Sequence, residues 1–515
     1  MSDPPRQPPT LGGILARPRG LDLLWLLLPP VLAAIGFGLL PLRSWDYWWH
    51  LAIGRLVDHW GAVPAANHFL YTLPADTPSY VQPWLAQLLL YGLHELWNVH
   101  AGLLARNVAA ATAFAGLTWA AVRRSRSVPA GSLCALAGLV FALRLMEVRP
   151  RLFAWPIFLG LLGIGYGVRS RGWHPGWTLA FPAGTALWAN LHGSFLLGPA
   201  AGGAFVAASV VDSHRGEGDG RWPWWGGAFA ASLAAPLANP RGPELYGYVY
   251  SLATDDYVRT TVTEWLPTMP TRPPVVGPLF YATVLAAAAL LWRRRTDADP
   301  ADVFLLTGTA LLAALQVRGL LWWGLTLPVA VSPYARGLLE AGDDEPGPLA
   351  RRLHTAAAGG LLLFGLAVQP MFQWRVDWTA SSPLFEVRRR QPLRGVVPDE
   401  TPFEAVELLA RYADPPRVFH DQRYAGFILF HLTGVRPART VFVDQRIELP
   451  PPRIWKLYEQ VVRQPDVWRG VFQQYDVGAA ILSRHQQPEL IDRMAGSEGW
   501  SMSRSTSDWV LLVRN

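Results

Sequence analysis

Eleven apolar runs constrain this chain more than any other feature of its sequence. A membrane-spanning helix needs about 20 mostly apolar residues. Several runs are shorter than this and prolines interrupt others, which membrane helices tolerate when neighbouring groups satisfy the freed carbonyls. The sequence therefore predicts a polytopic α-helical membrane protein with about eleven transmembrane helices. The runs cover residues 21–40, 103–122, 128–146, 152–168, 177–188, 194–211, 222–237, 278–292, 303–317, 320–334 and 355–368.

Arginine clusters indicate which loops stay in the cytoplasm, because loops rich in Lys and Arg are retained there. If the N-terminal segment 1–20 is inside, strict alternation of the apolar runs puts every later cluster inside as well. A further apolar run, residues 84–99, carries His94 and Glu95, and we expect it to be an interfacial or re-entrant helix. If residues 84–99 were counted as a span, every later loop would change sides, and the later arginine clusters would lie on the extracytoplasmic side. The clusters lie at residues 123–126, 169–171, 215–221, 293–295 and 351–352.

The same alternation divides the chain into three parts. We expect residues 1–20 to be a cytoplasmic segment, and residues 21–370 to be a transmembrane domain with a long first extracytoplasmic loop at 41–101. Residues 371–515 are expected on the far side as an extracytoplasmic α/β domain, because short helices and strands alternate there. We expect strands at residues 417–420, 440–443, 477–482 and 509–513, and helices at 403–412, 425–432, 454–462, 468–475 and 488–494.

The composition excludes several classes of function. The net charge of +7 comes almost wholly from arginine. Basic residues beside apolar runs fix orientation and give no reason to expect a nucleic-acid partner. Cys134 is the only cysteine, so no intramolecular disulfide can form. The sequence contains no glycine-rich phosphate loop, CxxC pair or GxSxG elbow, so nucleotide binding and serine hydrolase chemistry have no support.

Two carboxylates stand out in the segments expected outside. Asp46 lies directly after the first run, and His50 follows one helical turn later on the same face. Glu264 lies beside Trp265 in a later outer loop. A carboxylate at the bilayer edge needs a partner, so Asp46 is expected either to pair with Arg43 structurally or to act on substrate. Asp and His side chains of the first loop have no recognised metal spacing, and we expect no cofactor.

Cations and an amide fall on the same expected side. Arg149 and Arg151 offer two guanidiniums that suit phosphate oxygens, or else anchor their turn to lipid headgroups. Arg318 lies between two apolar runs, where an unpaired charge is costly and marks a candidate anion site. Asn190 and His192 interrupt an apolar hairpin in which a plain turn needs only glycine. Acids and cations thus converge on one leaflet.

The expected C-terminal domain adds polar residues just after two of its strands. Asp421 follows the strand at 417–420, and Asp444 and Arg446 follow the strand at 440–443. Ligands of open α/β sheets bind beyond the carboxyl ends of strands. Asp444 and Arg446 therefore either contact substrate or cap and pair within their own loop.

The layout and a few short motifs resemble a known superfamily. The layout consists of an acid after the first span, a long first outer loop, many spans and an outward C-terminal domain. The motifs are Tyr71-Thr72-Leu73-Pro74, Gln82-Pro83-Trp84, Trp48-Trp49-His50-Leu51, Trp188-Ala189-Asn190-Leu191-His192-Gly193 and Val443-Asp444-Gln445-Arg446. Together they resemble the GT-C glycosyltransferases, such as protein O-mannosyltransferases and the aminoarabinose transferases of lipid A. The last three motifs look like those of bacterial membrane proteins of unassigned function associated with that superfamily.

The resemblance implies an enzyme of the bacterial inner membrane that moves a sugar from a polyprenyl-phosphate-linked donor to an extracytoplasmic glycan, lipid or protein acceptor. In such an inverting transfer, a base deprotonates the acceptor hydroxyl while cations stabilise the departing lipid phosphate. Asp46 matches the family's first-loop catalytic acid, and we expect it to be the base. We expect Arg149, Arg151 and Arg318 to bind the phosphate. The expected catalytic residues are Asp46, His50 and Glu264, and the expected substrate-binding residues are Arg149, Arg151, Asn190, His192, Arg318, Asp444 and Arg446.

Other interpretations of the same residues stay open. His50 or His192 is expected to orient the donor or the acceptor. Tyr47 follows Asp46 where many relatives carry a second acid, which weakens any inference of a metal. A non-catalytic assembly protein, or one that binds the lipid carrier of cell-envelope glycan synthesis, would have this layout without needing Asp46. A transporter would place ionisable residues at the membrane midplane rather than at one edge.

Overall fold

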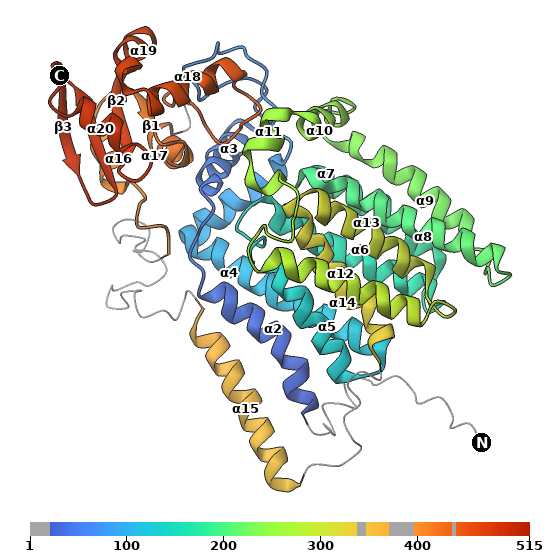
Figure 1. The fold of residues 1–515 in the computed structure, drawn as a ribbon. Coiled ribbons are helices and arrows are strands. Elements are labelled where there is room, and N and C mark those ends of the chain that lie inside the picture. The colour runs from blue at the N-terminus through green and yellow to red at the C-terminus, as the bar shows by residue number, and fades with distance from the viewer. Residues whose placement is uncertain (1–20, 337–346, 370–395, 435–438) are drawn as a thin grey trace, which may run out of the picture.

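The structure is a computed structural model that describes residues 21–336, 347–369, 396–434 and 439–515. The expected cytoplasmic segment 1–20 lies outside the described residues, as does the start of the expected C-terminal domain, residues 371–395. The described part is mostly helical, with a small α/β module at one end of a helix bundle (Figure 1).

Each apolar run of the sequence falls on a helix of this bundle. Their apolar composition explains the packing, because the helices bury aromatic and aliphatic side chains against one another in one large cluster. The bundle helices are α2 (Asp22–Gly38), α4 (Trp84–Ser125), α5 (Val128–Ala142), α6 (Ala154–Arg169), α7 (Ala180–Ala189), α8 (Leu197–His214), α9 (Trp222–Ala234), α12 (Val276–Arg293), α13 (Pro300–Leu315), α14 (Leu320–Ala335) and α15 (Pro348–Ala367).

Helix length and apolar composition identify fewer certain spans than the sequence predicts. Among the described residues, three helical segments meet both requirements for crossing a membrane, namely Pro150–Arg169, Gly193–His214 and Val276–Arg293. Shorter apolar helices lie beside them in the bundle. The helical membrane architecture is therefore supported, and the number of about eleven spans stays a prediction.

Helix α4 combines the expected interfacial helix and the following span. Its backbone leaves helical geometry at Trp97, with φ of −157°, and at Asn98, with φ of 39° and ψ of −140°. This break lies where the expected interfacial helix, residues 84–99, meets the run at 103–122. The expected boundary between the two segments therefore coincides with a break in the helix.

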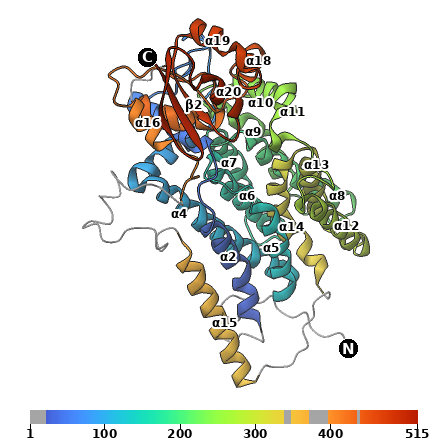
Figure 2. The same cartoon turned by 60° about the vertical axis from the view of Figure 1, so that its left-hand side comes forward.

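Arginine clusters that are distant in sequence gather at one end of the bundle. Arg124 Nη2 lies 2.8 Å from Asp302 Oδ2. Arg169 lies 2.8 Å from an oxygen of Asp212 and 2.7 Å from an oxygen of Asp299. The C-terminal module lies at the opposite end, beside α3 (Asp46–Trp60), α10 (Glu244–Thr254) and α11 (Asp256–Thr261) (Figures 1 and 2).

Helix α3, which begins at Asp46, is held between the bundle and the C-terminal module. A Cβ on Gly54 would lie 2.2 Å from the Gln87 carbonyl oxygen on α4. A Cβ on Gly426 of α17 would lie 2.7 Å from the backbone nitrogen of Trp49. Glycine at both positions allows backbones to approach this closely. The position of Asp46 is thus fixed from two sides.

The C-terminal module contains a mixed four-stranded sheet with the order β1-β2-β4-β3. Strands β1 and β2 are parallel, and the other two pairs are antiparallel. Buried aliphatic residues on β1, β2 and β4 form the core together with α3. The elements are β1 (Arg417–His420), β2 (Val477–Ser483), β3 (Trp500–Ser505), β4 (Trp509–Arg514), α16 (Phe403–Leu409), α17 (Ala425–Leu432), α18 (Pro452–Arg463), α19 (Trp468–Tyr475) and α20 (Pro488–Met494).

Two expectations for this module are corrected. The expected strand at 440–443 makes only single bridges, in which Val441 pairs with Leu70 of the first loop and with Val418 of β1. Its position between two partners, followed at once by the Asp444 turn, prevents a continuous ladder. Strand β3 was not expected, because its exposed and largely polar residues lack an apolar alternation.

Candidate functional site

The candidate site begins where α3 starts, at the end of the bundle that carries the C-terminal module. Asp46 Oδ2 lies 3.3 Å from Arg149 Nη2, and the Asp46 side chain is 33% exposed. Arg43, which is exposed, makes no ion pair with Asp46 in the described part of the chain. The expected Arg43 pairing is therefore wrong, because the turn before α6 brings Arg149 closer.

Arg149 is the centre of an ion-pair network. Its nitrogens lie 3.0 Å from an oxygen of Glu147 and 2.9 Å from an oxygen of Glu264, in addition to the Asp46 contact. Its Nε also donates a 2.6 Å hydrogen bond to Ser44 Oγ. Carboxylates on three sides leave this guanidinium little capacity for another anion. The structure therefore removes the reason for treating Arg149 as a free phosphate ligand.

Glu264 is held as a carboxylate by the surrounding guanidiniums. Burial raises the pKa of Glu264, but the positive charges of Arg151, Arg149 and Arg318 outweigh burial and lower it to about 2. Such a group is ionised at neutral pH and is a weak base. Its position in a short 3₁₀ turn, Thr263–Trp265, suits it to orient guanidiniums rather than to carry protons.

Arg151 has unused hydrogen-bonding capacity in a buried position. The residue is 5% exposed, and its Nη1 lies 3.6 Å from Glu264 Oε2. Its Nε and Nη2 have no hydrogen-bond partner among the described residues. Unpaired buried donors are costly, and more so on a charged group. Arg151 therefore needs a further acceptor.

Arg318 lies in the short turn between α13 and α14, Val317–Gly319. Its guanidinium carbon is 4.4 Å from the centre of the Trp265 ring. No carboxylate lies within ion-pair distance of it among the residues that the structure describes. Burial, followed by repulsion from Arg151, lowers the pKa of Arg318 to about 10, so it stays charged at neutral pH. Arg151 and Arg318 thus have one carboxylate near them, Glu264, which also pairs with Arg149.

Two histidines complete the site in their neutral form. Burial, together with Arg318 and Arg151, lowers the pKa of His192 well below its ordinary value. Its Nδ1 accepts a 3.0 Å hydrogen bond from the Ser194 backbone nitrogen. Burial, together with Arg149, lowers the pKa of His50 to about 3. Both rings therefore act near neutral pH as hydrogen-bonding groups and not as cations.

Asn190 lies at the edge of the site and is engaged by other parts of the chain. Its Oδ1 accepts hydrogen bonds from Trp84 Nε1 at 2.7 Å and from Asn239 Nδ2 at 3.2 Å. Its Nδ2 donates to the Ala186 carbonyl at 2.9 Å. These hydrogen bonds connect the end of α7 to the start of α4. Asn190 therefore has a structural role between the two helices.

Asp444 and Arg446 are engaged with each other and with the first loop. They form a short buried ion pair, with Asp444 fully buried and Arg446 5% exposed. Arg446 Nη1 donates a 2.6 Å hydrogen bond to Ser79 Oγ of the first loop, and the guanidinium lies 5.4 Å from the Trp49 ring centre. Of the two interpretations left open by the sequence, the contacts favour pairing: this pair joins the C-terminal module to the first loop. Asp421 likewise pairs with an arginine of its own loop, Arg423.

No group of three or more His, Cys, Asp or Glu side chains in the described ranges is arranged to hold a metal ion.

Residues such as Ser44 and Gln87 were missed by sequence reasoning. Gln87 Nε2 lies 3.1 Å from His50 Nδ1, and Ser44 bonds Arg149. Neither residue carries a motif, because both contacts join segments that are distant in sequence.

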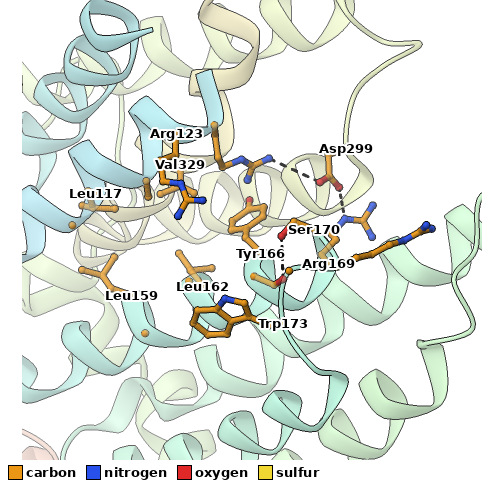
Figure 3. A pocket seen from close by; sticks show the side chains of 18 of the residues that line it. Leu117, Arg123, Leu159, Leu162, Tyr166, Arg169, Ser170, Trp173, Asp299 and Val329 are labelled. Atoms are coloured by element: carbon orange, nitrogen blue, oxygen red, sulfur yellow. Dashed lines mark hydrogen bonds and ion pairs between the residues drawn. The ribbon is translucent and has the colours of Figure 1, made fainter. Parts of the chain in front are cut away.

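A separate cavity of about 1130 Å³ lies at the other end of the bundle, near the arginine clusters (Figure 3). Helix α6 has the candidate site before its first turn and Arg169 at its last residue, and its 16 residues span about 24 Å. The cavity and the candidate site with Arg149, Arg151 and Arg318 are therefore two distinct places in the molecule.

Comparison with known proteins identifies the fold. No protein-family model matches the chain, and no curated protein matches its sequence. ArnT from Cupriavidus metallidurans, solved bound to undecaprenyl phosphate, is similar with a TM-score of 0.52 and 13% identity, over 98% of each chain. The chain has a GT-C-like fold. An oligosaccharyltransferase from Archaeoglobus fulgidus, tethered with an acceptor peptide containing the NVT sequon, gives a TM-score of 0.49 at 10% identity, over 94% of this chain and 74% of that one.

The fold predicted by the sequence resemblance is thus confirmed by a structure. The similarity to ArnT extends over nearly the whole chain, so it includes the C-terminal module as well as the bundle. At this level of identity the comparison concerns the fold alone. The roles of the site residues depend on the contacts described above.

Proposed function

We propose that this protein is a membrane glycosyltransferase that moves a sugar from a polyprenyl-phosphate-linked donor to an acceptor at the end of the bundle that carries the C-terminal module. The observation that carries the proposal is the buried Arg151, which keeps two unpaired donor nitrogens beside Arg318. Two desolvated guanidiniums that have only one carboxylate, Glu264, near them suit a phosphate. The fold is also that of a protein solved with undecaprenyl phosphate.

The proposed donor phosphate lies between Arg151 and Arg318. During transfer, the bond between the anomeric carbon and the phosphate oxygen breaks, and the electron pair remains on the phosphate. The two guanidiniums stabilise the negative charge that develops there. We do not assign this role to Arg149, because three carboxylates already surround it.

Asp46 is the proposed base. The acceptor hydroxyl oxygen forms the new bond to the anomeric carbon, and its proton passes to the Asp46 carboxylate. Asp46 is one-third exposed and contacts Arg149 through a single oxygen, so its other oxygen can reach a substrate. Glu264 is less suitable as a base, because its pKa of about 2 makes it a weaker proton acceptor. We assign it to the orientation of Arg149 and Arg151.

The neutral histidines are proposed to orient the sugar or the acceptor through hydrogen bonds. His192 lies near Arg318 and Arg151, so it is placed on the donor side. His50 is fixed by Gln87 and lies on the same helix as Asp46. The acceptor is proposed to enter between the outer loops and the C-terminal module.

The proposed location is the bacterial inner membrane, with the C-terminal module on the extracytoplasmic side. This orientation places the gathered arginine clusters in the cytoplasm, in agreement with the retention of arginine-rich loops there. With about eleven spans, the two ends of the described chain then lie on opposite sides of the membrane.

The test is transfer of a labelled sugar in membranes that contain the protein. Polyprenyl-phosphate sugars of several kinds are supplied in turn, and both labelled product and released polyprenyl phosphate are measured. The wild-type protein should release polyprenyl phosphate from one of them, and Asp46→Asn should lower that rate about 10²- to 10⁴-fold. Binding of the donor without release by the wild-type protein would instead support a non-catalytic lipid-carrier-binding protein.

A further inference from the structure

The cavity at the arginine-rich end is lined in part by glycines. It lies between α4 and α6 with α14 behind it (Figure 3). Gly116 on α4 and Gly160 and Gly163 on α6 line it, and all three residues are exposed. A Cβ added to any of these glycines would meet no atom within 4 Å among the described residues. The two helices therefore face each other across open space.

A gap of this kind on the side of a membrane helix bundle is filled by another apolar molecule, because an empty apolar wall loses its dispersion contacts. The volume of about 1130 Å³ is larger than a packing defect and exceeds most small-ligand pockets. The half-buried Leu159 and the buried Leu117 and Leu162 line the cavity. The interior of the cavity thus suits a hydrocarbon chain.

The rim of the cavity at the end of α4 is positively charged. Arg123 and Arg126 line it and are exposed. Arg123 lies 6.0 Å from the Trp119 ring centre, and neither arginine has a carboxylate within ion-pair distance in the described part of the chain. Arg124 Nη1 is buried there without a hydrogen-bond partner among the described residues. These cations have hydrogen-bonding capacity to offer an anion.

The acidic residues of the cavity are mostly paired with arginines of the same region. Asp212 and Asp299 bind the Arg169 guanidinium at 2.8 and 2.7 Å. Asp219 lies 3.2 Å from Arg221, at the rim formed by the loop between α8 and α9. Glu217 lies in that same loop. Arg123 and Arg126 are therefore the unpaired cations at the end of α4, while Arg171 of the cavity shares Asp219 with Arg221, at 3.8 Å, and Glu217 has no ion pair among the described residues.

We propose that this cavity binds a membrane phospholipid, with an acyl chain between α4 and α6 and the phosphate at Arg123 and Arg126. The phosphate of this lipid is separated from the proposed donor phosphate by the length of α6, about 24 Å. The two lipids therefore occupy different leaflets. The inference does not depend on the proposed transfer reaction.

Native mass spectrometry of the delipidated full-length protein tests the proposal. Phosphatidylglycerol is titrated against the protein, and diacylglycerol, which has the same chains but no phosphate, is the matched ligand. Each arginine near a phosphate surface contributes about 1 kcal/mol, so Arg123→Gln with Arg126→Gln should weaken phosphatidylglycerol binding about 30-fold. Gly163→Leu, which fills the gap, should weaken the binding of both lipids.

Two control variants match these changes outside the cavity. Arg293→Gln with Arg294→Gln removes two exposed arginines at the end of α12. Gly308→Leu adds a leucine side chain at an exposed glycine of α13 with nothing within 4 Å among the described residues. Both controls should bind phosphatidylglycerol as the wild-type protein does.

Three results would overturn the proposal. The first is unchanged binding in both cavity variants. The second is equal weakening by the cavity and control variants, which would indicate a diffuse lipid annulus. The third is displacement of phosphatidylglycerol by undecaprenyl phosphate with retained dependence on Gly163, which would assign the gap to the donor's tail.

Discussion

Arg151 contacts Glu264 through one nitrogen only: its Nη1 lies 3.6 Å from Glu264 Oε2, and its Nε and Nη2 have no partner among the described residues. The guanidinium is nevertheless almost fully buried. Leaving two donor nitrogens of a buried charged group unpaired costs free energy, and a further acceptor would remove that cost. The account of this site rests on that acceptor being a lipid phosphate.

Loss of the Arg151 or the Arg318 guanidinium should weaken the binding of undecaprenyl phosphate. A hydrogen bond to a charged group contributes about 1.5–3 kcal/mol, so Arg151→Gln or Arg318→Gln should raise the Kd roughly 10- to 100-fold. Arg259→Gln, at an exposed arginine of α11, is the matched control and should leave the Kd unchanged. Wild-type affinity in both site variants would place the phosphate elsewhere.

Replacement of Asp46 by Asn should remove basicity while it preserves the fold. The Asp46–Arg149 pair is one-third exposed on the Asp46 side, and pairs of this kind contribute about 0–1 kcal/mol. The melting temperature should therefore stay close to that of the wild-type protein, while turnover falls about 10²- to 10⁴-fold. Asp58→Asn, at an exposed position of the same helix, should keep full turnover.

Glu147→Gln distinguishes the proposed role of Asp46 as a base from its role as an ion-pair partner of Arg149. Glu147 also pairs with Arg149, at 3.0 Å. If pairing with Arg149 were the only function of Asp46, both substitutions would lower turnover to a similar degree. We expect the loss in Glu147→Gln to be at least ten times smaller than in Asp46→Asn, since it removes no base from the site.

The pH dependence of stability should change when Glu264 is replaced by Gln. Nearby arginines outweigh burial and lower the pKa of Glu264 from 4.5 to about 2 in the folded protein. The ionised carboxylate therefore stabilises the fold above about pH 4.5, and this stabilisation is lost as the pH falls towards 2. Melting temperatures of the wild-type protein and Glu264→Gln should differ at pH 7 and converge as the pH falls. A constant difference over that range would contradict this interpretation.

The buried Asp444–Arg446 pair should matter for stability and not for donor binding. Removing one partner of a buried ion pair costs about 3–5 kcal/mol, so Asp444→Asn should strongly lower the melting temperature. Asp476→Asn breaks an exposed pair with Arg514 and should cost about 0–1 kcal/mol. A Kd for undecaprenyl phosphate that rises in folded Asp444→Asn protein would show that the pair belongs to the site.

Strongly patterned elements of the C-terminal module were predictable from the sequence. Strand β1 and helices α17 and α19 begin and end at the expected residues, because each has a clear apolar pattern and well-marked ends. Strand β3 was not predictable, because it lies at the sheet edge and exposes most of its side chains. Val441 was predicted within a strand, since its apolar segment resembles one, yet it forms only single bridges.

The candidate site was predictable only in part as a set of residues, and not as a set of contacts: Asn190, Asp444 and Arg446 are engaged between elements, and Ser44 and Gln87 were not predicted. Asp46 and Arg318 were identified because charged side chains are unusual beside apolar runs, and Glu264 because it is a carboxylate next to an aromatic residue in an outer loop. Their partners depend on tertiary structure: Arg149 reaches Asp46 only because the turn before α6 lies beside the start of α3. Spacing along the chain contains no information about that contact.

The most direct measurement is an experimental structure of the full-length protein in lipid nanodiscs with undecaprenyl phosphate. The account predicts that the phosphate lies within hydrogen-bonding distance of both Arg151 and Arg318, at the end of the bundle that carries Asp46. A phosphate found instead beside Arg123 and Arg126, or away from any of these arginines, would contradict the proposed donor site and the transfer reaction built on it.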